Sequence, residues 1–436
     1  MKETVRQPAQ HKVAGILLLV MILATTLAGL GLGDFLWLSG GCALTALALL
    51  WSRMRRVQRI QCFIFLGVGL LTLIWAWLAG YREIPVLQLM TQNHLLISLL
   101  SAVSFLRLIT DASKEDHNTV QLGFRAFLKT LAGLHLFASV INLSALIIFG
   151  DRLSRHGRLE RTAATSIQRS FSLASLWSPF FAAMGTCLLY APGARLADLW
   201  GLSVPLCLFG FAFTLAEHRF RRGGDLEAFE GYPVNFRALW VPLIMVICVL
   251  LAHRALPSVS VLVLVSALSL VVTTAVLAWR QSLSRSLSTI RDFSCNRLPD
   301  MYGELALFLC AGIMATGLSV LVSQTAPELG IDAFTSGAAI AVLAILLTLA
   351  IIGVHALISI VATSAILAPL SPDPILLALV FIVTWSVGAT GGPISGLNLA
   401  MQSRYNVKAW ECFTWNIAYT LAMFTGTSVL ILAAFA

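Results

Sequence analysis

Long apolar stretches, each of about 20 residues and enough to cross a bilayer, recur along this 436-residue chain. Hydrophobic residues occupy 58% of its positions and charged residues only 11%. A water-soluble domain of this composition could not cover its surface with polar groups, so the lipid bilayer must serve as solvent for most of the chain. The sequence therefore predicts an all-α polytopic membrane protein with about 11 transmembrane helices.

The apolar stretches also give the expected order of spans. The first, at 13–31, is not followed by a convincing small-residue cleavage site, so we interpret it as an uncleaved helix. A polar arm at 111–129 and an arginine-rich loop at 151–169 flank a short apolar piece at 130–150. The other expected spans lie at 34–52, 60–80, 94–111, 171–192, 201–217, 237–254, 258–279, 302–324, 335–370, 374–396 and 410–435.

Basic residues are distributed unevenly between the two sides of the expected membrane. We place the N-terminus in the cytoplasm and treat 130–150 and the end of 335–370 as re-entrant hairpins. All but Arg82, Arg195 and Arg254 of the 29 basic residues then lie on the cytoplasmic side. Because positive loops are retained there during insertion, this asymmetry predicts a multi-pass protein of the bacterial inner membrane. If 130–150 crossed the membrane instead, the arginine-rich loop would lie outside, so the charge pattern favours a hairpin.

Cysteine spacing and net charge exclude several classes of site. The eight cysteines are scattered, with no CxxC pair and no His/Cys cluster, so neither a disulfide framework nor a metal site is expected. The only ion expected as a cofactor is Na⁺, in a coupling role. The formal charge of +9 follows the membrane topology, so we expect the lipid bilayer and a small solute as partners and no nucleic acid.

An internal repeat links the two halves of the chain. Residues 132–148 align with 352–368 at an offset of 220, and farther on a Trp-Ser pair recurs as Trp177-Ser178 and Trp385-Ser386. The two hairpins enter from opposite faces in the expected topology, which makes the repeat inverted, as in many secondary transporters. The identical positions in the first match are Gly133, His135, Ser139, Ser144 and Ala145 with Gly353, His355, Ser359, Ser364 and Ala365.

Each hairpin is followed by a span that contains a helix breaker: Pro179 in 171–192, and the Gly-Gly-Pro run at 391–393 in 374–396. Backbone groups freed at mid-membrane need partners that lipid lacks, so we expect the breaks and hairpin turns to surround a polar cavity. No Asp or Glu lies in these segments, which favours an anionic solute over a cation. The expected substrate- or ion-binding residues are Ser139, Asn142, Ser144, Ser178, Ser359, Thr363, Ser364, Ser386, Thr390, Gly391, Gly392 and Ser395.

His135 and His355 occupy matching positions in the aligned repeat and have two interpretations. Histidine titrates near neutral pH, so the pair is a candidate proton carrier or anion contact. Each ring can instead tie a hairpin arm to a neighbouring carbonyl, which is a packing role that would also recur in both halves. The sequence leaves both interpretations open.

At these hairpins and breaks the chain resembles the ion transporter superfamily, which includes divalent-anion/sodium symporters, citrate carriers and arsenite pumps. That resemblance implies inverted repeats, each with a re-entrant hairpin and a discontinuous helix, and often a homodimer. One branch binds sodium and a substrate carboxylate with a Ser-Asn-Thr sequence at each hairpin tip. Here Asn142, in Ile-Asn-Leu-Ser-Ala (141–145), matches the first tip asparagine, whereas Ala-Thr-Ser-Ala (362–365) contains none.

These features predict a secondary transporter of a small carboxylate or oxyanion, coupled to Na⁺ or H⁺. An intramembrane serine hydrolase built on Gly-Pro-Ile-Ser-Gly (392–396), and a non-transporting receptor or assembly subunit, are the alternatives. The expected organisation is N-terminal helices in 1–93, a first repeat core in 94–217 with its hairpin at 130–150, and connecting helices in 218–301. A second repeat core in 302–436 has its hairpin at about 342–370.

Overall fold

The computed structural model describes residues 8–83, 85–110, 121–154, 157–221, 226–232, 240–325 and 333–435. Most of the polar arm, residues 111–120, lies outside these ranges. The described chain is almost entirely helical, and nine of its segments are long and apolar enough to cross a membrane. The all-α, multi-span fold class expected from the sequence is therefore confirmed. Three shorter apolar helical segments lie at Leu243–Ala255, Ser336–Ile352 and Ala356–Leu370.

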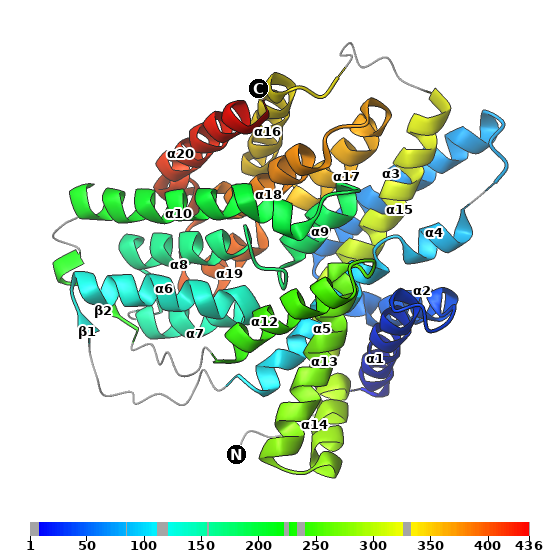
Figure 1. Ribbon diagram of the computed structural model, residues 1–436, viewed down its shortest axis with the longest axis horizontal. Helices are drawn as coiled ribbons and strands as arrows, with labels where there is room; N and C mark the ends of the chain where they lie inside the picture. Colours follow the sequence, from blue (N-terminus) through cyan, green and yellow to red (C-terminus); the bar gives the residue numbers. More distant parts are fainter. Residues whose placement is uncertain are drawn as a thin grey trace. The chain divides into compact units, whose positions relative to one another are not determined.

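The chain forms two compact units, and each is made from two separate parts of the sequence. Unit 1 comprises Met1–Ile109 and Ile244–Glu328, and unit 2 comprises Thr110–Leu243 and Leu329–Ala436. Figure 1 colours the helices in chain order.

Unit 1 is built from the apolar helices of the N-terminal and central parts of the chain. One close crossing joins α3 to α15 at Gly69 and Gly317, where a Cβ on Gly69 would lie 2.8 Å from the Ile313 carbonyl oxygen. Only glycine allows the two backbones to approach this closely. The helices are α1 (Ala9–Gly29), α2 (Leu36–Leu50), η1 (Trp51–Arg53), α3 (Arg56–Leu78), α4 (Val86–Thr91), α5 (His94–Ser104), η2 (Phe105–Leu108), α12 (Trp240–Ala255, shared with unit 2 at its start), α13 (Val261–Arg280), α14 (Leu283–Asn296), η4 (Leu298–Met301) and α15 (Tyr302–Thr325).

Unit 2 repeats one series of five helices. The first series is α6 (Phe124–Ile141), α7 (Leu143–Leu153), α8 (Arg161–Ala174), α9 (Ala182–Tyr190) and α10 (Leu196–Arg221). The second is α16 (Ser336–Ile352), α17 (Ala356–Leu367), α18 (Pro374–Gly391), α19 (Gly396–Tyr405) and α20 (Ala409–Phe435), with η5 (Ala368–Leu370) after α17. The first residues of matched helices are 212 to 214 positions apart, so the two halves share one order of elements.

This register differs from the offset of 220 given by the sequence match. The difference of about seven residues is two helical turns, which leaves the same side chains on the same helix face. Small and apolar residues that recur at helical spacing therefore align almost as well when one repeat is shifted by two turns against the other. In the register of the helices, His355 corresponds to Asn142, and His135 has no histidine partner.

Each series opens with a helical hairpin. The first turns at Asn142, which adopts a φ of 48°, and its arms α6 and α7 place the Phe137 and Phe149 rings 6.1 Å apart. The second turns at Gly353, whose φ is 112°, and its second arm α17 starts directly after His355. A two-residue antiparallel ladder, β1 (Gln121–Leu122) with β2 (Glu230–Gly231), lies beside the start of α6.

After the hairpin, each series has a helix interrupted part-way. The first interruption separates α8 from α9 and contains Pro179, and the second separates α18 from α19 and contains Gly392 and Pro393. Within unit 2, α8 lies between α6 and α10 (Figure 1) and contacts both. The hairpin tips and the interruptions are thus held in one unit.

Candidate functional site: the hairpin tips and helix breaks of unit 2

The first hairpin tip contacts the first helix break directly. The Asn142 amide donates a hydrogen bond to the Phe180 carbonyl at 3.1 Å, and the Ser178 hydroxyl donates to the Ser139 carbonyl. Ser178 also accepts from the Phe180 amide at 3.2 Å. Side chains of the tip and break therefore satisfy backbone groups that the broken helix leaves free.

Two buried oxygens at this tip lack a partner within the described part of the chain, namely Asn142 Oδ1 and Ser144 Oγ. A buried polar atom without a partner is costly in free energy, so such atoms mark places where a ligand can bind. Ser359 Oγ, on α17, is in the same condition.

The second hairpin tip and second break enclose a cavity of about 140 Å³. Cavities of about 150 Å³ bind molecules the size of benzene, so this space suits a small solute. The His355 and Trp385 rings form part of its wall and meet edge to face, with centroids 5.7 Å apart. The full lining is Phe171, Ala350, Gly353, Val354, His355, Ala356, Trp385, Gly388, Ala389, Ile394, Ser395, Gly396 and Leu397.

The N-termini of two helices meet at this cavity. His355 is the N-cap of α17 and accepts the Leu357 amide on Nδ1 at 3.2 Å, and Ser395 is the N-cap of α19 and accepts the Asn398 amide at 3.1 Å. Each cap satisfies one amide of its first turn, and other N–H groups of that turn have no partner within the helix. Two partial positive charges therefore face the same small space, whose lining contains no carboxylate.

The carbonyls freed at the end of α18 already have donors. The Asn398 amide donates to the Thr390 carbonyl at 3.0 Å and to the Gly392 carbonyl at 2.9 Å. The Ser395 hydroxyl donates to the Ala389 carbonyl at 2.7 Å. Side chains of α19 and its cap thus occupy carbonyls that a bound cation would otherwise use.

The sequence-predicted site residues fall into four groups. Ser139, Asn142, Ser144 and Ser178 lie at the first tip and break, and His355 and Ser395 lie at the cavity. Ser386, Thr390, Gly391 and Gly392 belong to α18 and its end, where Ser386 and Thr390 bind Ser172 of α8. Ser359, Thr363 and Ser364 lie along α17 rather than in the turn, and Ser364 donates to the Tyr190 carbonyl at the end of α9.

Both ring nitrogens of His135 contact neighbouring protein groups, as in a packing role. Its Nδ1 lies 3.1 Å from the Ser170 carbonyl, and its Nε2 accepts the Trp177 indole N–H at 2.8 Å. These contacts assign a neutral ring with the proton on Nδ1. The two histidines therefore differ, because His355 lines the cavity and His135 ties α6 to α8 and the first break.

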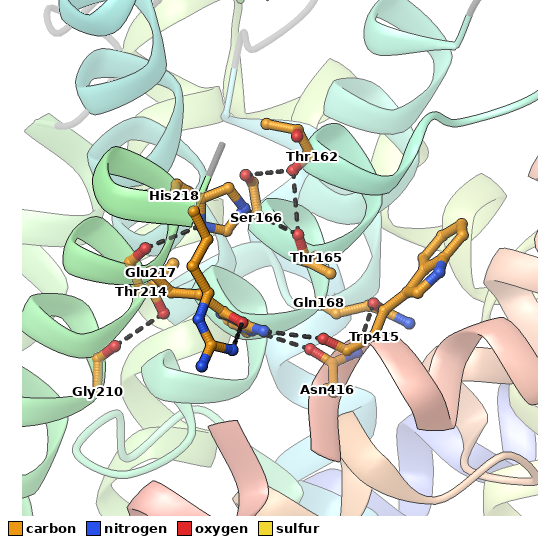
Figure 2. Close-up of polar contacts among 12 residues, drawn as sticks. Thr162, Thr165, Ser166, Gln168, Gly210, Thr214, Glu217, His218, Trp415 and Asn416 are labelled. Atoms are coloured by element: carbon orange, nitrogen blue, oxygen red, sulfur yellow. Dashed lines mark hydrogen bonds and ion pairs between the residues drawn. The ribbon is translucent and has the colours of Figure 1, made fainter. Parts of the chain in front are cut away.

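A buried polar network in unit 2 is absent from the sequence prediction. Arg169 on α8 is 1% exposed and donates to Glu217 of α10 at 2.5 Å, to Asn416 of α20 at 2.9 Å, and to the Trp415 carbonyl at 3.0 Å. Figure 2 shows Glu217, Asn416 and Gln168 converging from three helices. In the sequence, Arg169 is the last arginine of the arginine-rich loop and resembles the arginines before it. The signal that could have distinguished it is Glu217, a glutamate near the end of an apolar helix.

The network continues to the second break. The Asn416 amide donates to Gln168 at 2.9 Å, and the Gln168 amide donates to Asn398 at 2.7 Å. Asn398 in turn binds the carbonyls at the end of α18. An unbroken series of side-chain hydrogen bonds thus joins the Arg169–Glu217 ion pair to the edge of the cavity.

Comparisons with known proteins identify the fold. No protein-family model matches the sequence, and no curated protein is significantly similar to it. Among solved structures, the chain is similar to the YdaH transporter of Alcanivorax borkumensis, described as having an unusual topology. The match has a TM-score of 0.53 and 14% identity, and it covers 85% of this chain and 97% of that one. At this identity the similarity establishes a transporter-like fold for a multi-pass membrane protein.

Proposed function

We propose that this protein is a secondary transporter that carries a small carboxylate or oxyanion by alternating access, coupled to an ion gradient. The observation that carries the proposal is the convergence of the α17 and α19 N-termini on one cavity. Helix N-termini attract anions through oriented N–H groups and the helix dipole. A cavity of about 140 Å³ restricts the solute to a small one.

An inverted repeat gives the proposal its transport mechanism. Where α8 crosses α18, the Ser386 hydroxyl donates to the Ser172 carbonyl at 2.8 Å and the Ser172 hydroxyl donates to the Ser386 carbonyl. Such an exchange is typical of two elements related by a local twofold axis. A twofold axis between two otherwise equivalent halves allows the pair to rock between inward-open and outward-open states around one site.

The proposal also includes a placement of the chain in the membrane. Hairpins α6–α7 and α16–α17 enter the membrane from opposite faces and leave by the face they entered, with the N-terminus in the cytoplasm of a bacterial cell. The positive charge of the cytoplasmic segments and the apolar hairpin arms support this placement. We also propose the likeness to the ion transporter superfamily, whose members often form homodimers, on the residues of the hairpin tips and helix breaks that resemble it.

The intramembrane hydrolase alternative has less support. Ser395 is an N-cap whose hydroxyl donates to the Ala389 carbonyl and accepts from the Asn398 amide, so among the described residues its hydroxyl bonds to backbone groups. A nucleophilic serine needs a base within hydrogen-bond reach.

A binding and transport assay tests the proposal. Purified protein is heated with acetate, succinate, phosphate or sulfate, with sodium and pH varied, because a ligand of the folded state raises the melting temperature. The best-stabilising anion is then supplied to proteoliposomes under an imposed Na⁺ or H⁺ gradient. We expect gradient-driven uptake in the native protein and loss of uptake in a His355→Asn variant that remains folded, because His355 lines the cavity. Stabilisation by neither anion class, with no uptake, would show the proposal to be wrong.

A further inference from the structure

The buried carboxylate of unit 2 has no role in the proposed anion cavity, yet a hydrogen-bonded network connects the two. Among the described residues of unit 2, Glu217 is the only Asp or Glu that is buried. It lies in the last turns of α10 and forms an ion pair with Arg169 of α8. Ionisable groups buried in this way are rare within membrane helices and commonly mark proton or ion pathways.

We infer that Glu217 is a proton-binding site whose occupancy sets the anion affinity of the cavity at the second helix break. This inference rests on the proposed function. Uptake of one proton converts the Glu217 carboxylate to a neutral carboxyl group. The Arg169 guanidinium, which keeps its charge, then has no counter-charge in the pair, and a solute anion at the cavity can balance it.

The geometry connects the two sites within a few residues. Phe171, two positions after Arg169 on α8, lines the cavity, and Asn398 directly follows the cavity residue Leu397. Between them run the Arg169–Asn416, Asn416–Gln168 and Gln168–Asn398 hydrogen bonds, none longer than 2.9 Å. A guanidinium released from its carboxylate therefore acts on the cavity both through its field and through this series of bonds.

At the second break, side-chain donors already occupy carbonyls that a coupling cation would need. Asn398 and Ser395 donate to the carbonyls of Ala389, Thr390 and Gly392, and their N–H and O–H groups stand where a cation would be coordinated. A proton held on a separate carboxylate can change the charge balance there without requiring those carbonyls.

The charged and titratable groups around Glu217 come from α8, from α10 itself and from α20. On α8 the nearest charged group is Arg169, and Arg161 lies farther along the same helix, over the Trp415 ring. On α10 itself, Arg221 lies 3.8 Å from Glu217, and His218 hydrogen-bonds to Thr165. From α20, the Tyr419 ring stacks on Arg169 at 4.8 Å, and α18 carries no titratable residue. Both arginines oppose protonation in the anion-free state, so proton binding and anion binding must favour each other.

Infrared spectroscopy of the full-length protein in lipid vesicles tests proton binding directly. With saturating inorganic phosphate present to balance the charge of Arg169, we expect the absorption of a protonated carboxyl group to appear in the native protein as the pH is lowered from about 8 to about 5. It should be present in Asp198→Asn and missing in Glu217→Gln. Asp198 is the matched control, because it lies on the same helix, in an exposed first turn paired with Arg195. A band of equal size in Glu217→Gln, or no band in the native protein, would overturn the inference.

Succinate and inorganic phosphate then test the link to the anion site. We expect each probe that binds to do so about tenfold more tightly at about pH 5.5 than at about pH 7.5, within the usual range of coupling between two sites. Glu217→Gln, which resembles the protonated state, should keep the tighter affinity at both pH values. The same pH dependence in that variant and in the native protein would contradict the inference. If neither probe binds any variant while the infrared band titrates, the anion proposal fails and the proton site stands.

A folding control keeps the test decisive. Glu217→Gln leaves Arg169 buried without a counter-charge and so risks misfolding, whereas Arg169→Gln/Glu217→Gln removes both charges. If only the double variant folds, its infrared titration is compared with that of the native protein. The carboxyl band should again be lost, and its persistence would again overturn the inference.

Discussion

Ser172 and Ser386 each accept a hydrogen bond from the other at the point where α8 crosses α18. Both residues are buried, and Thr390 adds a third bond by donating to the Ser172 hydroxyl at 2.7 Å. The contact joins the helices that carry the two breaks, and it joins them through one residue from each repeat. It is therefore one of the contacts that the proposed movement of one repeat against the other would have to accommodate.

Removing these hydroxyls should destabilise the crossing. We expect Ser172→Ala to cost about 1–2 kcal/mol of unfolding free energy, because it removes both the acceptor of the Thr390 hydroxyl and the bond that the Ser172 hydroxyl donates to the Ser386 carbonyl. Ser386→Ala should cost less, and the double variant less than the sum, since the two share partners. Thermal unfolding in detergent measures this, with the exposed Ser288→Ala as control. Strict additivity would show that the two bonds are independent.

The second break requires glycine at one position and tolerates a side chain at another. A Cβ on Gly392 would lie 2.6 Å from the Ala350 carbonyl and 2.7 Å from that of Gly388, although its φ of −79° suits any residue. A Cβ on Gly396 would meet nothing within 4 Å. We expect Gly392→Ala to cost about 1–3 kcal/mol by overpacking and Gly396→Ala to be nearly neutral. Equal melting temperatures for both variants would contradict the geometry of the break.

Substitutions of His135 and His355 should have different effects on anion affinity and stability. His355→Asn keeps an N-cap for α17 but removes the ring from the cavity, so we expect anion affinity to fall with little change in stability. His135→Asn should do the reverse, lowering stability by about 1–3 kcal/mol because the Trp177 indole N–H loses its acceptor. Isothermal calorimetry with the best-stabilising anion, together with melting temperatures, measures both. An affinity loss confined to His135→Asn would reverse the assignment.

The ion pair between Asp151 of the first repeat and Arg404 of the second, which we call the clamp, should weaken in acid. Arg404 hydrogen-bonds to both oxygens of Asp151 at the end of α7, and this holds the pKa of the Asp151 carboxyl below its usual value, with further help from Tyr405. A lowered folded-state pKa contributes stability above the unfolded value, and that stability is lost as the pH falls through the folded value. Because the Asp151 side chain is 48% exposed, we expect less than about 1 kcal/mol.

Comparing the melting temperature of the native protein with that of Asp151→Asn measures this clamp. The native protein should be more stable at about pH 6. The difference should begin to shrink as the pH falls toward about 4, the pKa of an unfolded Asp, and should vanish only below the lowered folded-state pKa of Asp151. A difference that persists unchanged in acid would show that packing rather than charge stabilises the clamp.

Local sequence signals predicted the fold class and several features near the site, because they depend on neighbouring residues. Apolar stretches gave the multi-span fold, and Pro179 and Pro393 lie in the interruptions of their helices. The repeat register was displaced by two helical turns, since small residues at helical spacing look alike after such a slide. The displacement paired His135 with His355, which the structure separates.

The buried network could not be found in this way. Arg169 and Glu217 are 48 positions apart, and Arg169 and Asn416 are 247 apart, so no local pattern joins them. The position of Arg169 after a run of exposed arginines hides its burial. The convergence of two helix N-termini at the second break likewise depends on tertiary packing, and only the helix breakers near it could be predicted from the sequence.

The most direct test of the anion cavity measures its electrostatic potential without knowledge of the substrate. Gly396 lines the cavity and has room for a side chain, so Gly396→Cys places a thiol between the α17 and α19 N-termini. Its reaction with anionic and cationic methanethiosulfonates of equal size is compared with that of an exposed Ser288→Cys, after subtraction of native cysteine labelling. Two helix N-termini should favour the anionic reagent by about threefold or more at Gly396→Cys. Equal rates, or faster reaction with the cationic reagent, would contradict an anion-binding site at this break.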